Sequence, residues 1–225
     1  MTRKVAVLVD GAFYLRRHHS YFKDDTKRVS SPRKVARDLW IHCVKHVKKD
    51  QGEDLYRILF YDCPPVRKRV HHPLTNAVID LSQSATAKFK EEFFEHLVRQ
   101  AAVALRLGHL DEENATWQIR DKKLQKKILT GKALASSLSA DDYYYHANQK
   151  GVDMKIGLDI AAITLKKLAD KIVLIAGDSD FVPAAKMARR EGVKFILDPM
   201  NNPIRTDLSE HIDGKWTTLP PRIPV

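Results

Sequence analysis

The chain has 225 residues, of which 44% are hydrophobic and 30% are charged, a balance that excludes a disordered protein. Its formal net charge is +11, which favours a polyanionic partner such as nucleic acid, because Lys and Arg replace the counterions of phosphates. The length fits one α/β domain with an insertion, or two small domains.

The N-terminal part predicts a strand, a helix and a second strand. Residues 4–10, KVAVLVD, form an apolar, β-branched run typical of a strand that is buried on both faces, and DGAFYLRR then turns the chain. A helix is predicted over residues 31–49, with Ser31 as its cap and Pro32 in its first turn. Residues 55–63 predict the next strand, so the order indicates a right-handed βαβ crossover.

The middle of the chain, at about 64–150, interrupts this alternation. Residues 86–108 predict one amphipathic helix that ends at Gly108. A short strand is expected over 115–121, a basic helix or strand over 122–129, and an irregular segment over 137–151. We therefore expect a helical, basic insertion here.

The βαβ rhythm returns after Gly151. Helices are predicted over 153–169 and 180–192, and strands over 171–177 and 193–198. The expectation is a single α/β domain over 1–212, with a central, mostly parallel sheet. A proline-rich tail, 213–225, is expected to follow.

Aspartates follow the predicted strands. Asp10 and Asp178 come directly after buried strands, and Asp180 lies just beyond. Because the carboxyl ends of parallel strands meet at one edge of a sheet, these side chains are expected to lie close together. Asp153 opens the helix before the last strand pair. Asp159 lies six residues further on, about 120° around the helix axis, and is the weaker candidate.

Several close carboxylates repel one another unless a cation lies among them or one keeps a proton. Oxygen ligands suit Mg²⁺, and such a site on a basic protein indicates phosphodiester chemistry. The ordinary alternative is local: Asp180 or Asp153 would cap a helix, and Asp10 would stabilise a turn.

Three motifs resemble the NYN domain family of PIN-like, metal-dependent nucleases. They are VLVDGAFYL near the N-terminus, KGVDMKIGLDIAAIT in the centre and IVLIAGDSDFVPAAKMARREGVKFIL near the C-terminus. The resemblance implies a PIN-like αβα sandwich and an Mg²⁺- or Mn²⁺-dependent ribonuclease. Its acidic core would be Asp10, Asp153 and Asp178, with Asp180 and Asp159 at further acidic positions. Phe13 stands where many members carry Asn.

Three functions follow from these observations. The first is an endoribonuclease that hydrolyses RNA by in-line attack of water and leaves a 5′-phosphate and a 3′-hydroxyl. The second is an RNA-binding or regulatory module with an inactive nuclease-like site. The third, a phosphatase of the haloacid-dehalogenase type, ranks low because Ala12 stands where its second Asp is required. A homo-oligomer is possible, and the sequence does not decide the oligomeric state.

The remaining features bear on location and on RNA contact. The apolar run at 5–9 is too short for a signal peptide or a membrane span, so we expect a cytoplasmic protein without membrane attachment. Two isolated cysteines show no metal-binding spacing. Basic clusters at 67–69 and 122–127 could follow a phosphate backbone, and the tyrosines at 143–145 could stack on bases or pack in the core.

Overall fold

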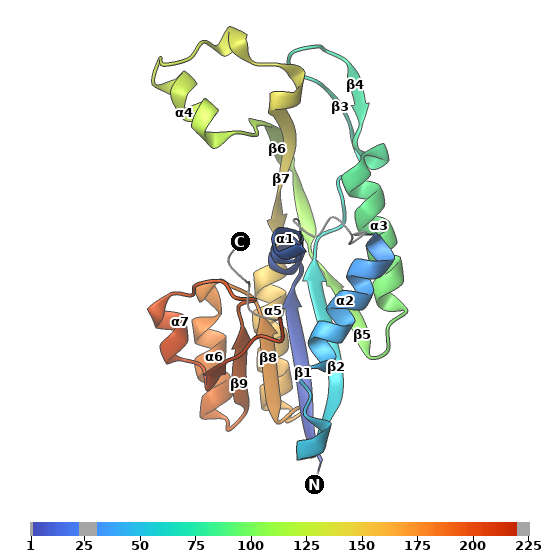
Figure 1. The fold of residues 1–225 in the computed structure, drawn as a ribbon, viewed down its shortest axis with the longest axis vertical. Helices are drawn as coiled ribbons and strands as arrows, with labels where there is room; N and C mark the ends of the chain where they lie inside the picture. Colours follow the sequence, from blue (N-terminus) through green and yellow to red (C-terminus); the bar gives the residue numbers. More distant parts are fainter. Residues whose placement is uncertain (1, 23–30, 220–225) are drawn as a thin grey trace.

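A six-stranded sheet forms the centre of the computed structural model, which describes residues 2–22 and 31–219. All neighbouring strands in it are parallel (Figure 1). Their order is β10 (Gly214–Lys215), β9 (Lys194–Asp198), β8 (Lys171–Ile175), β1 (Arg3–Asp10), β2 (Glu53–Asp62) and β5 (Val103–Leu107).

The sheet is buried on both faces, and its central strands carry continuous apolar runs, residues 5–9 in β1 and 172–175 in β8. In β1, residues Ala6 and Leu8 pack on one side, whereas Val7 and Val9 pack on the other. This alternation is the period of two of an extended chain. It explains why the strand appears in the sequence as a continuous apolar run.

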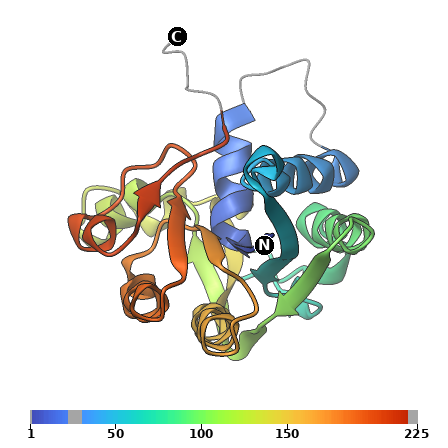
Figure 2. The same ribbon diagram turned by 90° about the horizontal axis from the view of Figure 1, so that it is seen from below.

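Helices cover both faces, as Figure 2 shows along the strands. One face carries α1 (Gly11–Phe22), α2 (Pro32–Val44) and α3 (Ala85–Val98). The other carries α5 (Val152–Leu165), α6 (Val182–Arg190) and α7 (Thr206–Glu210). The predicted α/β class and PIN-like αβα sandwich are therefore confirmed. The predicted Ser31 cap is present too, because its hydroxyl accepts a hydrogen bond from the Lys34 N–H over 3.3 Å.

Three element predictions were wrong. The segment 137–151 is not irregular throughout, because residues 143–150 form strand β7 (Tyr143–Lys150), which pairs with β6 (His109–Ile119). The segment after Asp10 is not a turn but α1, which follows β1 without a break. The helix predicted to reach Gly108 ends at Val98, and residues 103–107 form the edge strand β5. Ala101 and Leu105 continue the helical spacing by chance, while pairing with β2 decides the conformation, as tertiary contacts often override local pattern.

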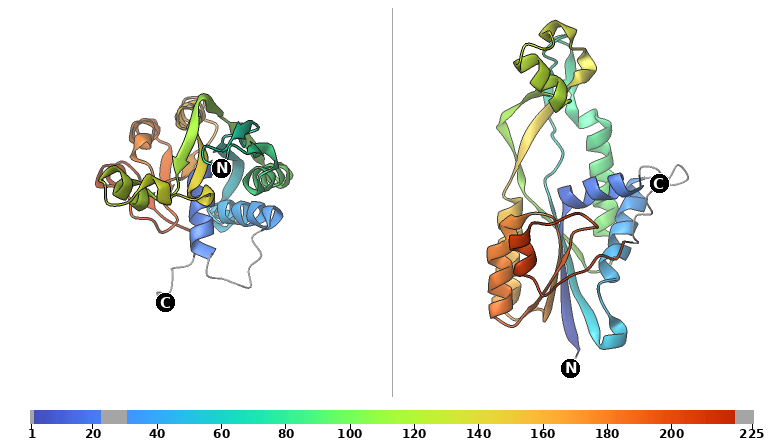
Figure 3. Two further views of the ribbon diagram at one scale, coloured as in Figure 1. Left: turned by 90° about the horizontal axis from the view of Figure 1, so that it is seen from above. Right: turned by 60° about the vertical axis from the view of Figure 1, so that its left-hand side comes forward.

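The expected insertion at 64–150 is divided between core and periphery. Its α3 and β5 belong to the sandwich, whereas residues 64–84 and 109–150, here called the extension, project beyond the carboxyl edge of the sheet (Figures 1 and 3). The extension is mainly two antiparallel ribbons, β3 (Arg69–His71) with β4 (Val78–Asp80) and β6 (His109–Ile119) with β7 (Tyr143–Lys150). Its only α-helix in the described part of the chain is α4 (Lys122–Leu129).

The first residues of the expected tail, 213–225, lie against the sandwich. Residues 214–215 pair with β9 as strand β10, and the Thr218 hydroxyl lies 3.0 Å from Nδ1 of His42. Residues 220–225, the end of the predicted tail, lie outside the described residues. Within the described residues, no helix has the length and apolar character needed to cross a membrane.

Candidate functional site

Asp10 lies where β1 ends and α1 begins. Its Oδ1 accepts a hydrogen bond from the Phe13 backbone N–H over 3.1 Å, so it also caps the helix. Burial raises the pKa of Asp10 to about 6; the Phe13 hydrogen bond opposes this rise, and the charges of Asp153 and Asp62 add to it. Asp10 is thus a carboxyl group among other acids, without enough positive charge to balance them.

Asp153 reaches the same edge from the first turn of α5. Gly151, at φ 77°, is the N-cap residue of that helix, in a left-handed conformation that glycine adopts without strain. Asp153 is therefore not the cap, and its exposed carboxylate makes no capping hydrogen bond. Burial raises the pKa of Asp153, and the charges of Asp178 and Asp180 raise it further.

The loop after β8 carries Asp178 and Asp180, both exposed. Asp178 Oδ1 accepts a hydrogen bond from the Asp180 N–H over 3.1 Å and caps a short 3₁₀ helix, Ser179–Phe181. The capping role expected for Asp180 therefore belongs to Asp178, because the chain makes a 3₁₀ turn before α6 starts. No side chain caps α6 itself.

A close contact between α1 and the loop after β8 holds these carboxylates in place. A Cβ atom added to Gly177 would lie 2.6 Å from the ring of Phe13, so only glycine allows the β8 loop to approach α1 this closely. Phe13 is buried in the core on its other sides. The residue that replaces the usual Asn of the first motif therefore packs the Asp10 turn against the Asp178 loop.

Replacement of this glycine is expected to be costly. The Gly177→Ala variant should lose about 1–3 kcal/mol of unfolding free energy, because the Phe13 ring must move out of a packed core. Gly157→Ala in α5 is the matched control, since nothing lies within 4 Å of its added Cβ and alanine favours a helix. Urea unfolding measures both. Equal stability of the two variants would contradict the packing role of Gly177.

The fifth predicted residue, Asp159, is engaged elsewhere. Its Oδ2 accepts hydrogen bonds from the Tyr61 hydroxyl at 2.8 Å and from Arg106 Nε at 3.1 Å. Both partners stand on neighbouring strands of the sheet, β2 and β5. The structure thus gives this carboxylate a local counter-charge, while its role as a metal ligand stays a prediction.

Asp62, which sequence reasoning did not select, belongs to the same region. It ends β2, is fully buried, and its charge contributes to the raised pKa of Asp10. Its Oδ1 accepts hydrogen bonds from Lys90 Nζ at 2.8 Å and Gln149 Nε2 at 3.1 Å, whereas Oδ2 has no partner. The sequence does contain a signal for Asp62, because this aspartate ends an apolar strand just as Asp10 does.

The charge balance of these acids separates them into two groups. Asp62 and Asp159 have ion-pair partners, Lys90 and Arg106. Within residues 2–22 and 31–219, no ion pair involves the acids of the other group, which are Asp10, Asp153, Asp178 and Asp180.

This second group fits a hard divalent cation. It offers carboxylate oxygens from three different elements, exposed to solvent on one side, and Mg²⁺ is usually held by few carboxylates, several waters and a substrate phosphate. In the described residues these oxygens do not draw as close together as a metal-bound set would, which is expected of like charges.

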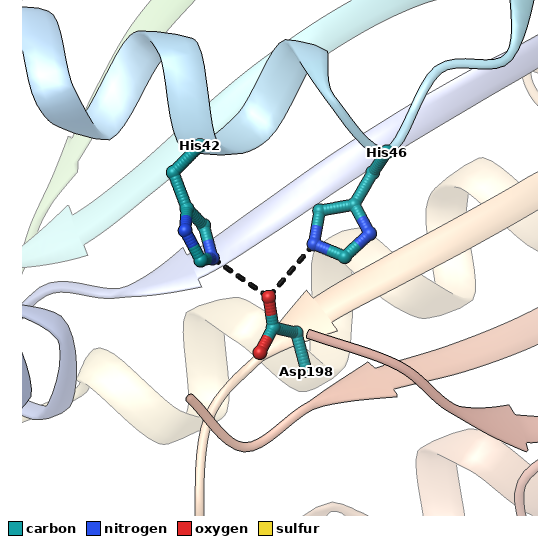
Figure 4. Close-up of side chains that lie close together, drawn as sticks. All are labelled: His42, His46 and Asp198. Carbon is teal, nitrogen blue, oxygen red and sulfur yellow. Dashed lines mark hydrogen bonds and ion pairs between the residues drawn. The ribbon is translucent and has the colours of Figure 1, made fainter. Parts of the chain in front are cut away.

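The compact metal-type cluster in the described residues is a different one. His42, His46 and Asp198 offer ligand atoms within 4.8 Å of one another, and all three are buried (Figure 4). Asp198 Oδ2 lies 2.7 Å from Nε2 of His42 and 2.8 Å from Nε2 of His46. Asp198 thus pairs with both imidazoles inside the protein, whereas His46 Nδ1 is buried and finds no hydrogen-bond partner among the described residues.

The family comparison agrees with the fold. The NYN domain model matches residues 4–207. A protein of unknown function from Vibrio parahaemolyticus is similar in structure, with a TM-score of 0.46 and 14% identity over 95% of this chain and 91% of that chain. No curated protein matches the sequence. Because the family model covers most of the sequence, this chain belongs to the NYN domain family of PIN-like nucleases.

Proposed function

We propose that the protein is a metal-dependent endoribonuclease whose site is the carboxylate group of Asp10, Asp153, Asp178 and Asp180. The observation that carries the proposal is that these four acids converge from three elements and find no ion-pair partner in the part of the chain that the structure describes. Purely structural carboxylates would be neutralised locally, as Asp62 and Asp159 are. Carboxylates that are not paired with a cationic side chain are suited to a bound metal ion and a phosphate.

The proposed chemistry is hydrolysis of a phosphodiester bond. A bound Mg²⁺ or Mn²⁺ would lower the pKa of a water molecule and offset charge on the phosphate. The four aspartates would hold the ion, and the hydrogen bonds of Asp10 with Phe13 and of Asp178 with Asp180 would fix the direction of two of them. Water adds to phosphorus, the bond to the 3′ oxygen breaks, and a 5′-phosphate and a 3′-hydroxyl result.

RNA is the proposed substrate. The net charge of +11 favours a polyanion, and the extension rises from the edge of the sheet that holds the four aspartates. In the extension, α4 presents four exposed lysines along one short helix, which would attract phosphates: Lys122, Lys123, Lys126 and Lys127.

Cleavage of labelled single- and double-stranded RNA and DNA, with Mg²⁺ or Mn²⁺ and with EDTA, tests the proposal. RNA cleavage is expected with metal only, and the Asp178→Asn variant should fold normally and fail to cleave. Asp54→Asn is the matched control, because Asp54 is exposed near the start of β2, at the end of the sheet away from the four aspartates. Wild-type activity of Asp178→Asn would show that the site is assigned wrongly. Absence of both cleavage and Mg²⁺ binding would favour an RNA-binding module instead.

A further inference from the structure

A groove lies between α3 and the β6–β7 ribbon, where the extension joins the sandwich. Its volume is about 450 Å³, within the range of roughly 300–1,000 Å³ typical of sites for small organic ligands. The groove is lined by apolar, aromatic and basic side chains, among them Pro65, Lys90, Trp117, Arg120, Tyr143 and Tyr145.

The aromatic rings of the groove are held in place by the ribbon. Trp117 lies opposite Tyr145 in the β6–β7 register, with ring centroids 5.6 Å apart at an interplanar angle of 77°. Trp117 Nε1 donates to the His71 carbonyl oxygen at 2.8 Å, and the Tyr145 hydroxyl donates to the Ala115 carbonyl oxygen at 3.3 Å. Both rings remain half-buried, so part of each ring is accessible to a ligand. Because the rings are already fixed, binding would cost little side-chain entropy.

Positive charge lies beside these rings. The exposed Arg120 guanidinium is 5.7 Å from the ring centre of Tyr144 and donates to the Tyr143 carbonyl oxygen at 3.2 Å. Lys90 approaches from α3 on the other side of the groove. Aromatic rings next to cations form the surface on which unpaired bases stack while their phosphates are neutralised.

The groove is connected to the carboxylate edge through one residue. Lys90 lines the groove and pairs with Asp62 at 2.8 Å, and Gln149 of β7 bonds the same oxygen. The negative charge of Asp62 raises the pKa of Asp10. A polynucleotide whose bases lie in the groove would thus approach the carboxylate edge from the side of Lys90 and Asp62.

We infer that this groove binds unpaired bases of a single-stranded polynucleotide and so selects single-stranded RNA for the proposed ribonuclease, on whose assignment the inference rests. Stacking on Trp117 and Tyr145 requires bases that are free of a duplex. In an A-form helix, the bases are paired and stacked on one another, and only backbone and groove edges are accessible. The ring faces do not distinguish RNA from DNA, because every base has a π-face.

Binding measured without cleavage tests the inference. Fluorescence anisotropy is recorded in EDTA with a labelled 12-nucleotide RNA strand, the same strand as a duplex, and the matching DNA strand. The groove variants are Tyr145→Leu, Tyr145→Phe and Arg120→Ala. The matched controls are Tyr56→Leu and Arg57→Ala, a second Arg–Tyr pair with the cation 5.9 Å from the ring, located towards the start of β2.

Tyr145→Leu is expected to weaken single-strand binding about 5- to 100-fold, whereas Tyr145→Phe, which keeps the ring, should bind within about twofold of the wild type. Arg120→Ala should weaken binding severalfold, and the two control variants should not. The duplex should bind more weakly and be insensitive to Tyr145→Leu. The DNA strand should respond to Tyr145→Leu as the RNA strand does.

Unchanged single-strand binding in Tyr145→Leu, or equal loss in Tyr145→Phe, would overturn the inference. Thermal unfolding of each variant shows whether a loss reflects misfolding. The outcome is separable from that of the proposed function. Groove variants that bind normally while the wild type cleaves RNA refute the groove alone. Selective binding without metal-dependent cleavage refutes the nuclease assignment alone.

Discussion

The Asp10→Asn variant is expected to cleave RNA at least about 10²-fold more slowly than the wild type and yet to be more stable without metal. The loss follows because an amide is a poorer metal ligand than a carboxylate. The gain follows because burial and the neighbouring acids disfavour the ionised form of Asp10. The Asn oxygen can still accept the Phe13 hydrogen bond, so α1 keeps its cap.

The stability gain depends on pH with a defined sign. Asp10 has its pKa raised from 3.8 to about 6, so between these values the folded protein holds a proton that the unfolded chain releases. The contribution of this group to stability therefore falls as pH rises from about 4 to 6, and above that the cost is about 1–3 kcal/mol. Asp10→Asn removes this cost.

Urea unfolding in EDTA at pH 7.5 and pH 4.5 measures the effect. The variant should exceed the wild type at pH 7.5, and the difference should shrink at pH 4.5. Asp159→Asn is the control, since Tyr61 and Arg106 already stabilise that carboxylate, and it should show no gain. A variant that is less stable than the wild type at pH 7.5 would contradict the electrostatic account of Asp10.

Local chain order predicts the sandwich and most of the candidate site well. Asp10 ends a buried strand and Asp178 lies in the loop that follows another, and in a parallel sheet such residues meet whatever the distance between them in sequence. Asp62 also ends a buried strand of the sheet, although it is not among the site residues predicted from the sequence. Its location also depends on Lys90 and Gln149, which come from α3 and β7 and whose approach no local pattern announces.

The sequence predicts a strand over 115–121 and a helix or strand over 122–129 in the extension, but not the β6–β7 ribbon, because long-range pairing creates it. Trp117 and Tyr145 face each other across a ribbon whose strands are separated by the segment 120–142. β6 is mostly polar, with only a weak alternation, so its strand character depends on cross-strand aromatic pairs. Likewise, β5 is a strand because β2 offers it a partner, although its apolar spacing continues that of α3.

The histidine cluster also depends on a contact that the local sequence does not predict. His42 and His46 are four residues apart, so both lie on one face of the region around α2, which the sequence reveals. Their partner, Asp198, comes from the end of β9, more than 150 residues away. Nothing local distinguishes this buried aspartate from a solvated one at a strand end, and only the fold shows that it belongs to the core.

The Asp198→Ala variant is expected to lose about 3–5 kcal/mol of unfolding free energy. Asp198 is completely buried and accepts three hydrogen bonds, from Nε2 of His42, Nε2 of His46 and the N–H of Met200 at 2.8 Å. Removal leaves three buried donors unpaired, each at a cost. Asp213→Ala is the control, because Asp213, just before β10, accepts the N–H of Phe195 in β9 but is partly exposed, and a loss of about 1–2 kcal/mol is expected.

The pH dependence of the wild type should report the same cluster. Burial would raise the pKa of Asp198, but the hydrogen bonds of both histidines outweigh it and hold the pKa below its usual value. Its contribution is therefore present above about pH 4 and lost as pH falls further. Burial lowers the pKa of His46, despite its bond to Asp198, so stability should already decline as pH falls below about 6.5, where the unfolded chain takes up that proton.

EDTA separates this cluster from the proposed catalytic metal site. Since Asp198 Oδ2 already accepts from both imidazoles, dialysis against EDTA should leave the urea midpoint of the wild type unchanged while it abolishes RNA cleavage. Asp198→Ala should respond in the opposite way, with a lower midpoint and with cleavage retained wherever the variant remains folded. A midpoint that falls on EDTA treatment and recovers with Zn²⁺ would instead make His42, His46 and Asp198 a structural metal site.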